Sequence, residues 1–204
     1  MIKLAIDCEF SHFDMIGGDL LSLAAVEVID DKDLGREFLC YCKPRGPKYF
    51  SDKAQEVHGI SYFKAQTFPE PRESMIKFLQ WLAPLQDQFQ LETIYWGSWN
   101  FDLKWIETTM QQTNLISSYY KAFKTSKESH HNALKMARQK LKLMPLPKAK
   151  TEAESKKGQY KLDNVARFYG LEHKHHEALS DARVTAQAWI KMNAGEKVWT
   201  GELF

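Results

Sequence analysis

The sequence lacks the features that mark membrane and secreted proteins. Among its 204 residues, no run approaches the roughly eighteen consecutive apolar residues of a membrane-spanning helix. The first residues, Met1–Glu9, carry acidic side chains where a signal peptide needs an unbroken apolar stretch. There are three cysteines, Cys8, Cys40 and Cys42, and the last two share one face of a strand-like run. We expect reduced thiols packed in a sheet, no zinc knuckle and a cytoplasmic protein.

A strong charge imbalance is also missing, because the formal net charge is only +2. Hydrophobic residues make up 44% and charged residues 26%, as in ordinary globular proteins, and the length fits one domain. We expect that domain to span residues 1–195, followed by a tail at 196–204. Positive charge gathers locally in residues 140–161, a segment of seven lysines that predicts a flexible loop. This loop either attracts a nucleic-acid backbone or only keeps the protein soluble.

Strand patterns dominate the N-terminal part and helix patterns the remainder. Apolar, β-branched runs predict strands at Ile2–Cys8, Leu20–Ile29 and Glu37–Cys42, and their short connections predict an antiparallel meander. A further buried strand is predicted at 93–96. Helix signals predict a helix over 52–59, one opening at Pro71, one after residue 96, and others over 132–143, 162–169 and 178–192. The pattern favours no element over 115–127. The chain is therefore predicted to be an α/β sandwich with a mixed sheet.

Two carboxylates stand at the end of the first predicted strand. Asp7 and Glu9 are two residues apart, so both side chains point to one face. Two acids this close repel each other, which a bound cation would relieve. A strand that simply leaves the core explains an isolated Asp-x-Glu equally well.

Two later segments add polar groups of the same kind. Asp102 falls in the first turn of a predicted helix that follows a buried strand, where an acid also complements the helix dipole. His176 precedes Asp181 by five residues, which places the histidine in the loop before the last helix and the aspartate one turn inside it. Taken alone, each segment is compatible with solvent-exposed surface residues.

In this order, the four acids and the histidine resemble the DEDDh group of DnaQ-like 3′→5′ exonucleases. The segment His176-x-Ala178-x-x-Asp181-Ala182 matches the last motif of that family at each defined position. Residues 57–61 and 161–171 are similar to two further family segments. The resemblance implies an RNase H-like fold, with a mixed five-stranded sheet (an antiparallel meander plus parallel strands) flanked by helices.

The resemblance also implies a mechanism and its cofactors. Asp7, Glu9, Asp102 and Asp181 would bind two Mg²⁺ ions, for which Mn²⁺ substitutes, with Asp7 between both ions. His176 would take the proton from the attacking water, and nucleoside 5′-monophosphates would be released. The substrate would be a 3′ end of single-stranded DNA or RNA, gripped by Phe10, Ser11, His58 and Trp99, with stacking also by His12 or Phe13. The resemblance leaves a homodimer open, and no membrane partner is expected.

The chain also departs from the family pattern. Phe10 and Ser11 stand where the family often has two threonines, and Ser98 stands where it often has asparagine. Gly97-Ser98-Trp99 resembles the branch of exonucleases that trim histone mRNA and small RNAs, so the subfamily stays open. Two alternative functions remain: an RNase H-like endonuclease or another phosphodiesterase, and a non-catalytic nucleic-acid-binding module.

Overall fold

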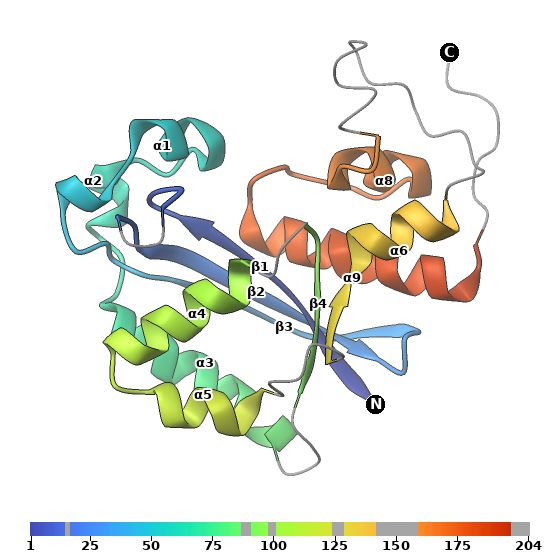
Figure 1. Ribbon diagram of the computed structural model, residues 1–204, viewed down its shortest axis with the longest axis horizontal. Coiled ribbons are helices and arrows are strands. Elements are labelled where there is room, and N and C mark those ends of the chain that lie inside the picture. The colour runs from blue at the N-terminus through green and yellow to red at the C-terminus, as the bar shows by residue number, and fades with distance from the viewer. Residues whose placement is uncertain (15–16, 87–90, 98–100, 124–128, 142–158, 197–204) are drawn as a thin grey trace.

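A single mixed sheet forms the centre of the molecule (Figure 1). The computed structural model describes residues 1–14, 17–86, 91–97, 101–123, 129–141 and 159–196. Within these ranges the strand order is β3-β2-β1-β4-β5. β1 pairs antiparallel with β2 and β2 with β3, whereas β4 is parallel to both β1 and β5. The strands are β1 Ile2–Phe10, β2 Leu20–Ile29, β3 Asp33–Tyr41, β4 Glu92–Tyr95 and β5 His130–Asn132.

Helices cover the two faces of this sheet in separate groups (Figure 1). One face carries α3 Pro71–Gln86, α4 Phe101–Gln112 and α5 Ile116–Ala122. The opposite face carries α6 Ala133–Lys140, α8 Leu162–Tyr169 and α9 Ala178–Ala194. Three short helices, η1 Pro47–Tyr49, α1 Asp52–His58 and α2 Tyr62–Ala65, follow β3.

The alternation of side chains along β1 explains why both faces are covered. Leu4 and Ile6 are buried against the α3–α5 side, whereas Ala5 between them is buried against the α9 side. The small residues Ala182 and Ala186 of α9 let that helix lie close to the sheet, which places its N-terminal turn beside the end of β1. The last part of β1 therefore stands between two helical layers.

Most predicted elements are present, and their ends follow from local chemistry. α1 and α8 end as predicted, at Gly59 and Gly170, which both adopt the left-handed conformation that glycine tolerates best. The third strand begins at Asp33 rather than at the predicted Glu37. Its first residues are mostly exposed, so no apolar pattern indicated that they pair with β2. α5 lies in the range for which the pattern favoured no element.

The fifth strand was the main element not located from the residues. β5 is the polar tripeptide His130–Asn132, which contains no apolar residue that would indicate a strand. It pairs in parallel with β4, so tertiary contact rather than propensity defines it. The helix predicted over 132–143 is Ala133–Lys140 in the structure. It begins at Ala133 because Asn132 is its N-cap, whose side chain accepts the backbone N–H of Lys135 at 2.7 Å.

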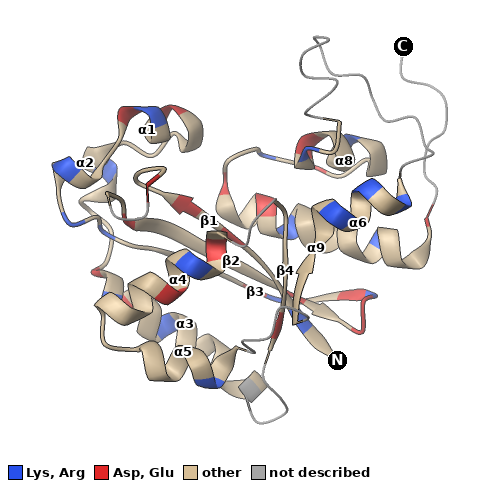
Figure 2. Cartoon of the chain, viewed as in Figure 1, with Lys and Arg blue, Asp and Glu red and all other residues tan. Residues whose placement is uncertain are grey.

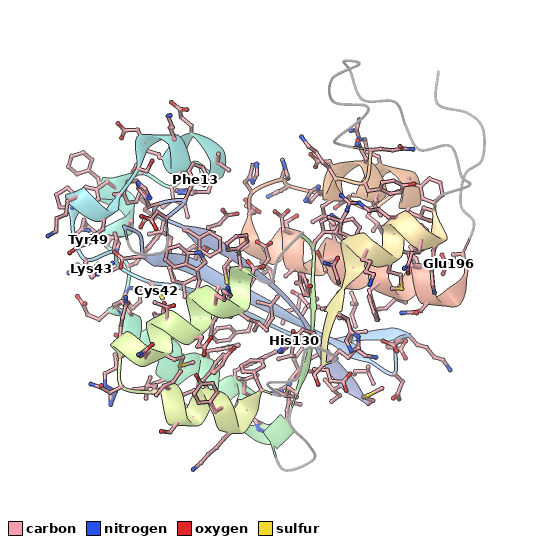
Figure 3. All side chains as sticks on the ribbon, viewed as in Figure 1. Phe13, Cys42, Lys43, Tyr49, His130 and Glu196 are labelled. Atoms are coloured by element: carbon pink, nitrogen blue, oxygen red, sulfur yellow. The ribbon has the colours of Figure 1, made fainter. Side chains whose placement is uncertain are left out.

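The three thiols are free and buried, as expected from the sequence. Cys42, labelled in Figure 3, lies with Cys8 and Cys40 in the core on the α3–α5 side. Within the described ranges no helix is both long and apolar enough to cross a membrane. Residues 142–158, which make up most of the predicted Lys-rich loop, and the tail from 197 onward fall outside the described part of the chain.

Candidate active site

The end of β1 presents the first two acids of the site. Asp7 and Glu9 point to the α9 side of the sheet, and Cys8 between them is buried on the opposite side. The pairing with β2 shifts register between Glu9 and Phe10. Such irregularities redirect side chains at the ends of strands, and they are common beside active sites.

Asp102 reaches the same place from the first turn of α4. β4 runs parallel to β1, so the helix that follows β4 begins at the edge of the sheet where β1 ends. The backbone N–H of Cys8 donates to Oδ1 of Asp102 at 3.1 Å, which ties this carboxylate to the backbone between Asp7 and Glu9. Figure 2 shows the acidic residues gathered at the end of β1 and at the start of α4.

Asp181 completes the group from the first turn of α9. It is buried, and its carboxylate oxygen lies within 4.8 Å of carboxylate oxygens of both Asp7 and Glu9. We call Asp7, Glu9, Asp102 and Asp181 the carboxylate cluster. The residues predicted from the sequence are therefore brought together from three elements, β1, α4 and α9.

His176 lies just before α9, in the segment 171–177 that we call the histidine segment. Glu177 is the N-cap of α9, so His176 precedes the helix and Asp181 is one turn inside it, as predicted. Its backbone has φ +62°, a left-handed conformation that is uncommon for residues with a side chain and recurs at functional sites. The rings of His175 and His176 have centroids 3.7 Å apart.

The electrostatics of the carboxylate cluster favour a bound cation. Burial raises the pKa of Glu9 to about 8, and the negative charges of Asp181 and Asp102 add to the effect. Burial likewise raises the pKa of Asp102 to about 7. The pKa of Asp7 is raised by burial first, then by Asp102, Asp181 and Glu9. Holding four ionised carboxylates together is unfavourable without counter-charge, and hard divalent cations with oxygen ligands supply it.

His173 is a site residue that the sequence did not single out. Its Nε2 is hydrogen-bonded to Oδ1 of Asp181, and its Nδ1 lies 2.6 Å from Oδ1 of Asp163 in the first turn of α8. Burial by itself would lower the pKa of His173, but the hydrogen bond to Asp181 and the charges of both aspartates together raise it. Three histidines within four residues were the only signal in the sequence, and their partners could not be inferred.

The predicted substrate residues occupy different environments. The ring of Phe10 stacks on Trp105, with centroids 4.8 Å apart, so one face of it is already used in the core. His58 is half-buried, and its Nδ1 accepts the backbone N–H of Ile60 at 3.0 Å. Phe13, labelled in Figure 3, is exposed after β1. Trp99 and Ser98 lie outside the described residues.

The hydroxyl of Ser11 is hydrogen-bonded within the protein. Its side chain is fully buried, its hydroxyl donates to the carbonyl of Tyr49 at 2.6 Å, and it accepts the N–H of Asp19 at 2.8 Å. Both hydrogen bonds join Ser11 to backbone groups, so it secures the chain after β1. The resemblance places Ser11 among the residues that grip the substrate, and that role stays a prediction.

Two clefts meet at the carboxylate cluster. The larger, about 760 Å³, is bounded by acids of the cluster and by Arg138, Tyr160 and Lys161. The smaller, about 340 Å³, extends over the ends of β2 and β3 towards His58 and Arg183. Glu9 and His176 line both clefts, so these two side chains stand where the clefts join.

One known protein family matches most of the chain. The family described as exonuclease (RNase T) matches residues 4–189. The chain belongs to this exonuclease family. No curated protein sequence matches this chain.

Solved structures of exonucleases share the fold. Exonuclease I of E. coli in complex with a dT13 oligonucleotide matches with a TM-score of 0.71 and 15% identity, over 93% of this chain and 41% of that one. The nuclease domain of 3'hExo, a DEDDh family member bound to rAMP, matches with a TM-score of 0.66 and 15% identity, over 96% and 93% of the two chains. The chain thus spans about two fifths of the length of exonuclease I. The likeness confirms the predicted RNase H-like fold, a mixed five-stranded sheet flanked by helices.

Proposed function

We propose that this exonuclease acts from 3′ to 5′ on single-stranded DNA or RNA and releases nucleoside 5′-monophosphates with the help of two Mg²⁺ ions. One observation carries the proposal: the carboxylate cluster forms where two clefts join, beside a histidine at that same junction. An RNase H-like fold alone would not specify this activity, because one fold hosts many functions. The structural neighbour 3'hExo is a DEDDh family member, and the letters of that family name stand for the same residue types, four acids and a histidine.

The donor set fits Mg²⁺. Asp7, Glu9 and Asp181 offer oxygen atoms within 4.8 Å of one another, and Asp102 adds a fourth carboxylate from α4. Mg²⁺ prefers carboxylates, waters and phosphate oxygens over nitrogen or sulfur. When bound, a pair of such ions neutralises phosphate charge and makes water more acidic. Asp7, whose pKa is raised by burial and by the charges of Asp102, Asp181 and Glu9, would be the residue to contact both ions.

His176 is suited to accept a proton at neutral pH. Burial, and next the neighbouring His175, lower its pKa below the ordinary value near 6.5. The ring is therefore neutral at pH 7 and has a free lone pair for the attacking water. Because His176 lines both clefts, its ring could take the proton from a water that attacks a phosphate bound over the carboxylate cluster.

The clefts supply opposite sides of a substrate site. Arg138 and Lys161 line the larger cleft and provide positive charge for a nucleic-acid backbone. The smaller cleft contains His58, Ile60 and Tyr41, a mixture of ring and apolar surface that suits a sugar and base. We place the terminal nucleotide in the smaller cleft and the rest of the strand in the larger one.

An assay on labelled ends tests the proposed direction and class together. The full chain is incubated with Mg²⁺ and single-stranded DNA or RNA labelled at either end, with closed circular single strands as the control. We expect 3′-labelled strands to release labelled mononucleotide at once, 5′-labelled strands to shorten gradually, and circles to remain intact. Cleavage of circles would instead indicate an endonuclease. Binding without cleavage under Mg²⁺ and Mn²⁺ would indicate a non-catalytic module.

A further inference from the structure

A second cluster of metal-binding side chains lies next to the carboxylate cluster. Asp163 in the first turn of α8, with His173 and His175 of the histidine segment, offers one carboxylate oxygen and two imidazole nitrogens within 4.8 Å of one another. Nδ1 of His173 is 2.6 Å from Oδ1 of Asp163, and Nε2 of His175 is 3.5 Å from Oδ2 of the same residue. We call these three residues the His–Asp cluster. None of them belongs to the carboxylate cluster.

A buried nitrogen atom points into the His–Asp cluster without a hydrogen bond. The side chain of His173 is only 5% exposed. Its Nδ1 is buried and makes no hydrogen bond of acceptable geometry with the described residues, although Oδ1 of Asp163 is close to it. Buried polar atoms are nearly always hydrogen-bonded, so a buried ring nitrogen that lies near a carboxylate and a second imidazole without a well-directed hydrogen bond needs an explanation. A shared cation supplies one, because it takes the lone pair of each ligand.

The other nitrogen of His173 is arranged as in known metal sites. Nε2 is hydrogen-bonded to the carboxylate of Asp181. Histidines that bind a metal through one nitrogen commonly donate the other N–H to a carboxylate, which fixes the tautomer and the orientation of the ring. In the neutral ring that donates Nε2–H to Asp181, Nδ1 would carry the lone pair and face the His–Asp cluster.

We propose that Asp163, His173 and His175 form a binding site for a single Zn²⁺ ion, with water in the fourth position. Two imidazoles and one carboxylate are typical zinc ligands, whereas Mg²⁺ favours a site made of oxygen atoms alone. The carboxylate cluster and the His–Asp cluster therefore select different ions. Asp163 and His175 are partly exposed, so the ion has a path from solvent.

The ion would connect α8, the histidine segment and the start of α9. It would hold His173 against Asp181, and thereby hold one acid of the carboxylate cluster in place. The site stands independently of the direction in which the exonuclease degrades its substrate, since it rests on three residues that are assigned no part in hydrolysis. Its role is in positioning.

A neighbouring set of residues offers a different location for the same ion. His175, His176 and Asp181 also present atoms within 4.8 Å of one another. That set would draw His176 and Asp181 away from the reaction, and it contains no nitrogen that is buried and unpaired. Asp163 belongs only to the proposed site and His176 only to the alternative, so substituting each of them separately distinguishes the two.

Calorimetric titration of the metal-free full chain with Zn²⁺ tests the proposal, with excess Mg²⁺ present to occupy the carboxylate cluster. We expect one Zn²⁺ per chain, and an affinity at least about tenfold weaker in Asp163→Asn and in His175→Ala, since even residues that only support a ligand contribute about this much. Asp52→Asn, in the first turn of α1, is the matched control and should bind as the parent chain does. Co²⁺ should give the visible absorption of a site with nitrogen ligands, and Asp163→Asn should remove it.

Thermal melting supplies a second measurement that does not depend on activity. Zn²⁺ should raise the melting temperature of the parent chain and of Asp52→Asn, and should leave that of Asp163→Asn unchanged. If His175→Ala does not fold, His175→Asn replaces it in both measurements. The proposal fails if Asp163→Asn binds Zn²⁺ as tightly as the parent chain. It also fails if His176→Ala, or Asp7→Asn under excess Mg²⁺, is the substitution that abolishes binding.

Discussion

The two halves of the active site are built in different ways. Asp7 and Glu9 stand on β1, whose backbone is fixed by pairing with β2 and β4. The side chain of Asp102, on α4, is tied to the same strand because it accepts the Cys8 N–H. His173 and His176 stand on the histidine segment, which is held through side-chain contacts with Asp163 and Asp181. A substitution in the first half should therefore change charge at constant geometry, whereas one in the second half should change geometry.

The largest effect is expected at Asp7, in the half of the site that is built on β1 and α4. Asp7→Asn should reduce the rate of nucleotide release by about 10⁴-fold or more, because ion binding contributes several kcal/mol to phosphodiester hydrolysis. When both are measured without Mg²⁺, the melting temperature of Asp7→Asn should be no lower than that of the parent chain. The substitution removes one of several buried acidic groups whose charges repel each other. Single-turnover kinetics and calorimetric melting measure both quantities. A large drop in melting temperature would show that Asp7 has a structural role instead.

His176→Ala tests the chemical contribution of the histidine segment. We expect the rate to fall by roughly 10³-fold, within the 10²–10⁴-fold range of general bases, with binding of single-stranded substrate retained. Binding is measured by fluorescence anisotropy in Ca²⁺, and the rate by release of mononucleotide in Mg²⁺. Full activity of this variant would contradict the assignment of His176 as the base.

His173 should have a smaller effect of a different kind. His173→Ala removes the hydrogen bond to Asp181, so we expect a loss of about 10–100-fold and a higher Mg²⁺ concentration for half-maximal rate. His173→Gln keeps an N–H group that can donate to Asp181, and it should recover part of the Mg²⁺ affinity. An equal rise in required Mg²⁺ for both variants would mean that His173 only fills space.

The smallest expected effect is on stability as a function of pH. The folded pKa of Glu9, about 8, exceeds the ordinary value of about 4.3, so between these values the folded chain binds more protons than the unfolded one. Without Mg²⁺, the contribution of Glu9 should therefore make the free energy of unfolding decrease as pH rises from about 4.3 towards 8. Melting scans from pH 5 to 8 should show this decline, by a few degrees, and Glu9→Gln should flatten it, whereas the exposed Glu56→Gln should not. A melting temperature that rises with pH would contradict the proposed repulsion.

Patterns local in sequence predicted much of the architecture. Alternation placed Asp7 and Glu9 on one face of a strand, and glycines marked the ends of α1 and α8. The polar strand β5 carried no such pattern, because its pairing with β4 rather than its composition makes it a strand. The buried position of Ser11 was equally hidden, since its partners Asp19 and Tyr49 come from other segments.

The sequence by itself determined which side chains are proposed to carry the chemistry: four acids and His176, in an order and spacing typical of DEDDh exonucleases. Only the tertiary structure decided how they meet. The bond from the Cys8 N–H to Asp102 joins residues 94 positions apart, and the contact between His173 and Asp163 links the histidine segment to α8. Periodicity reports on neighbours within a few residues, whereas hydrogen bonds and charge repulsion depend on distance in space. For that reason the proposed catalytic residues could be named in advance, but the His–Asp cluster beside them could not.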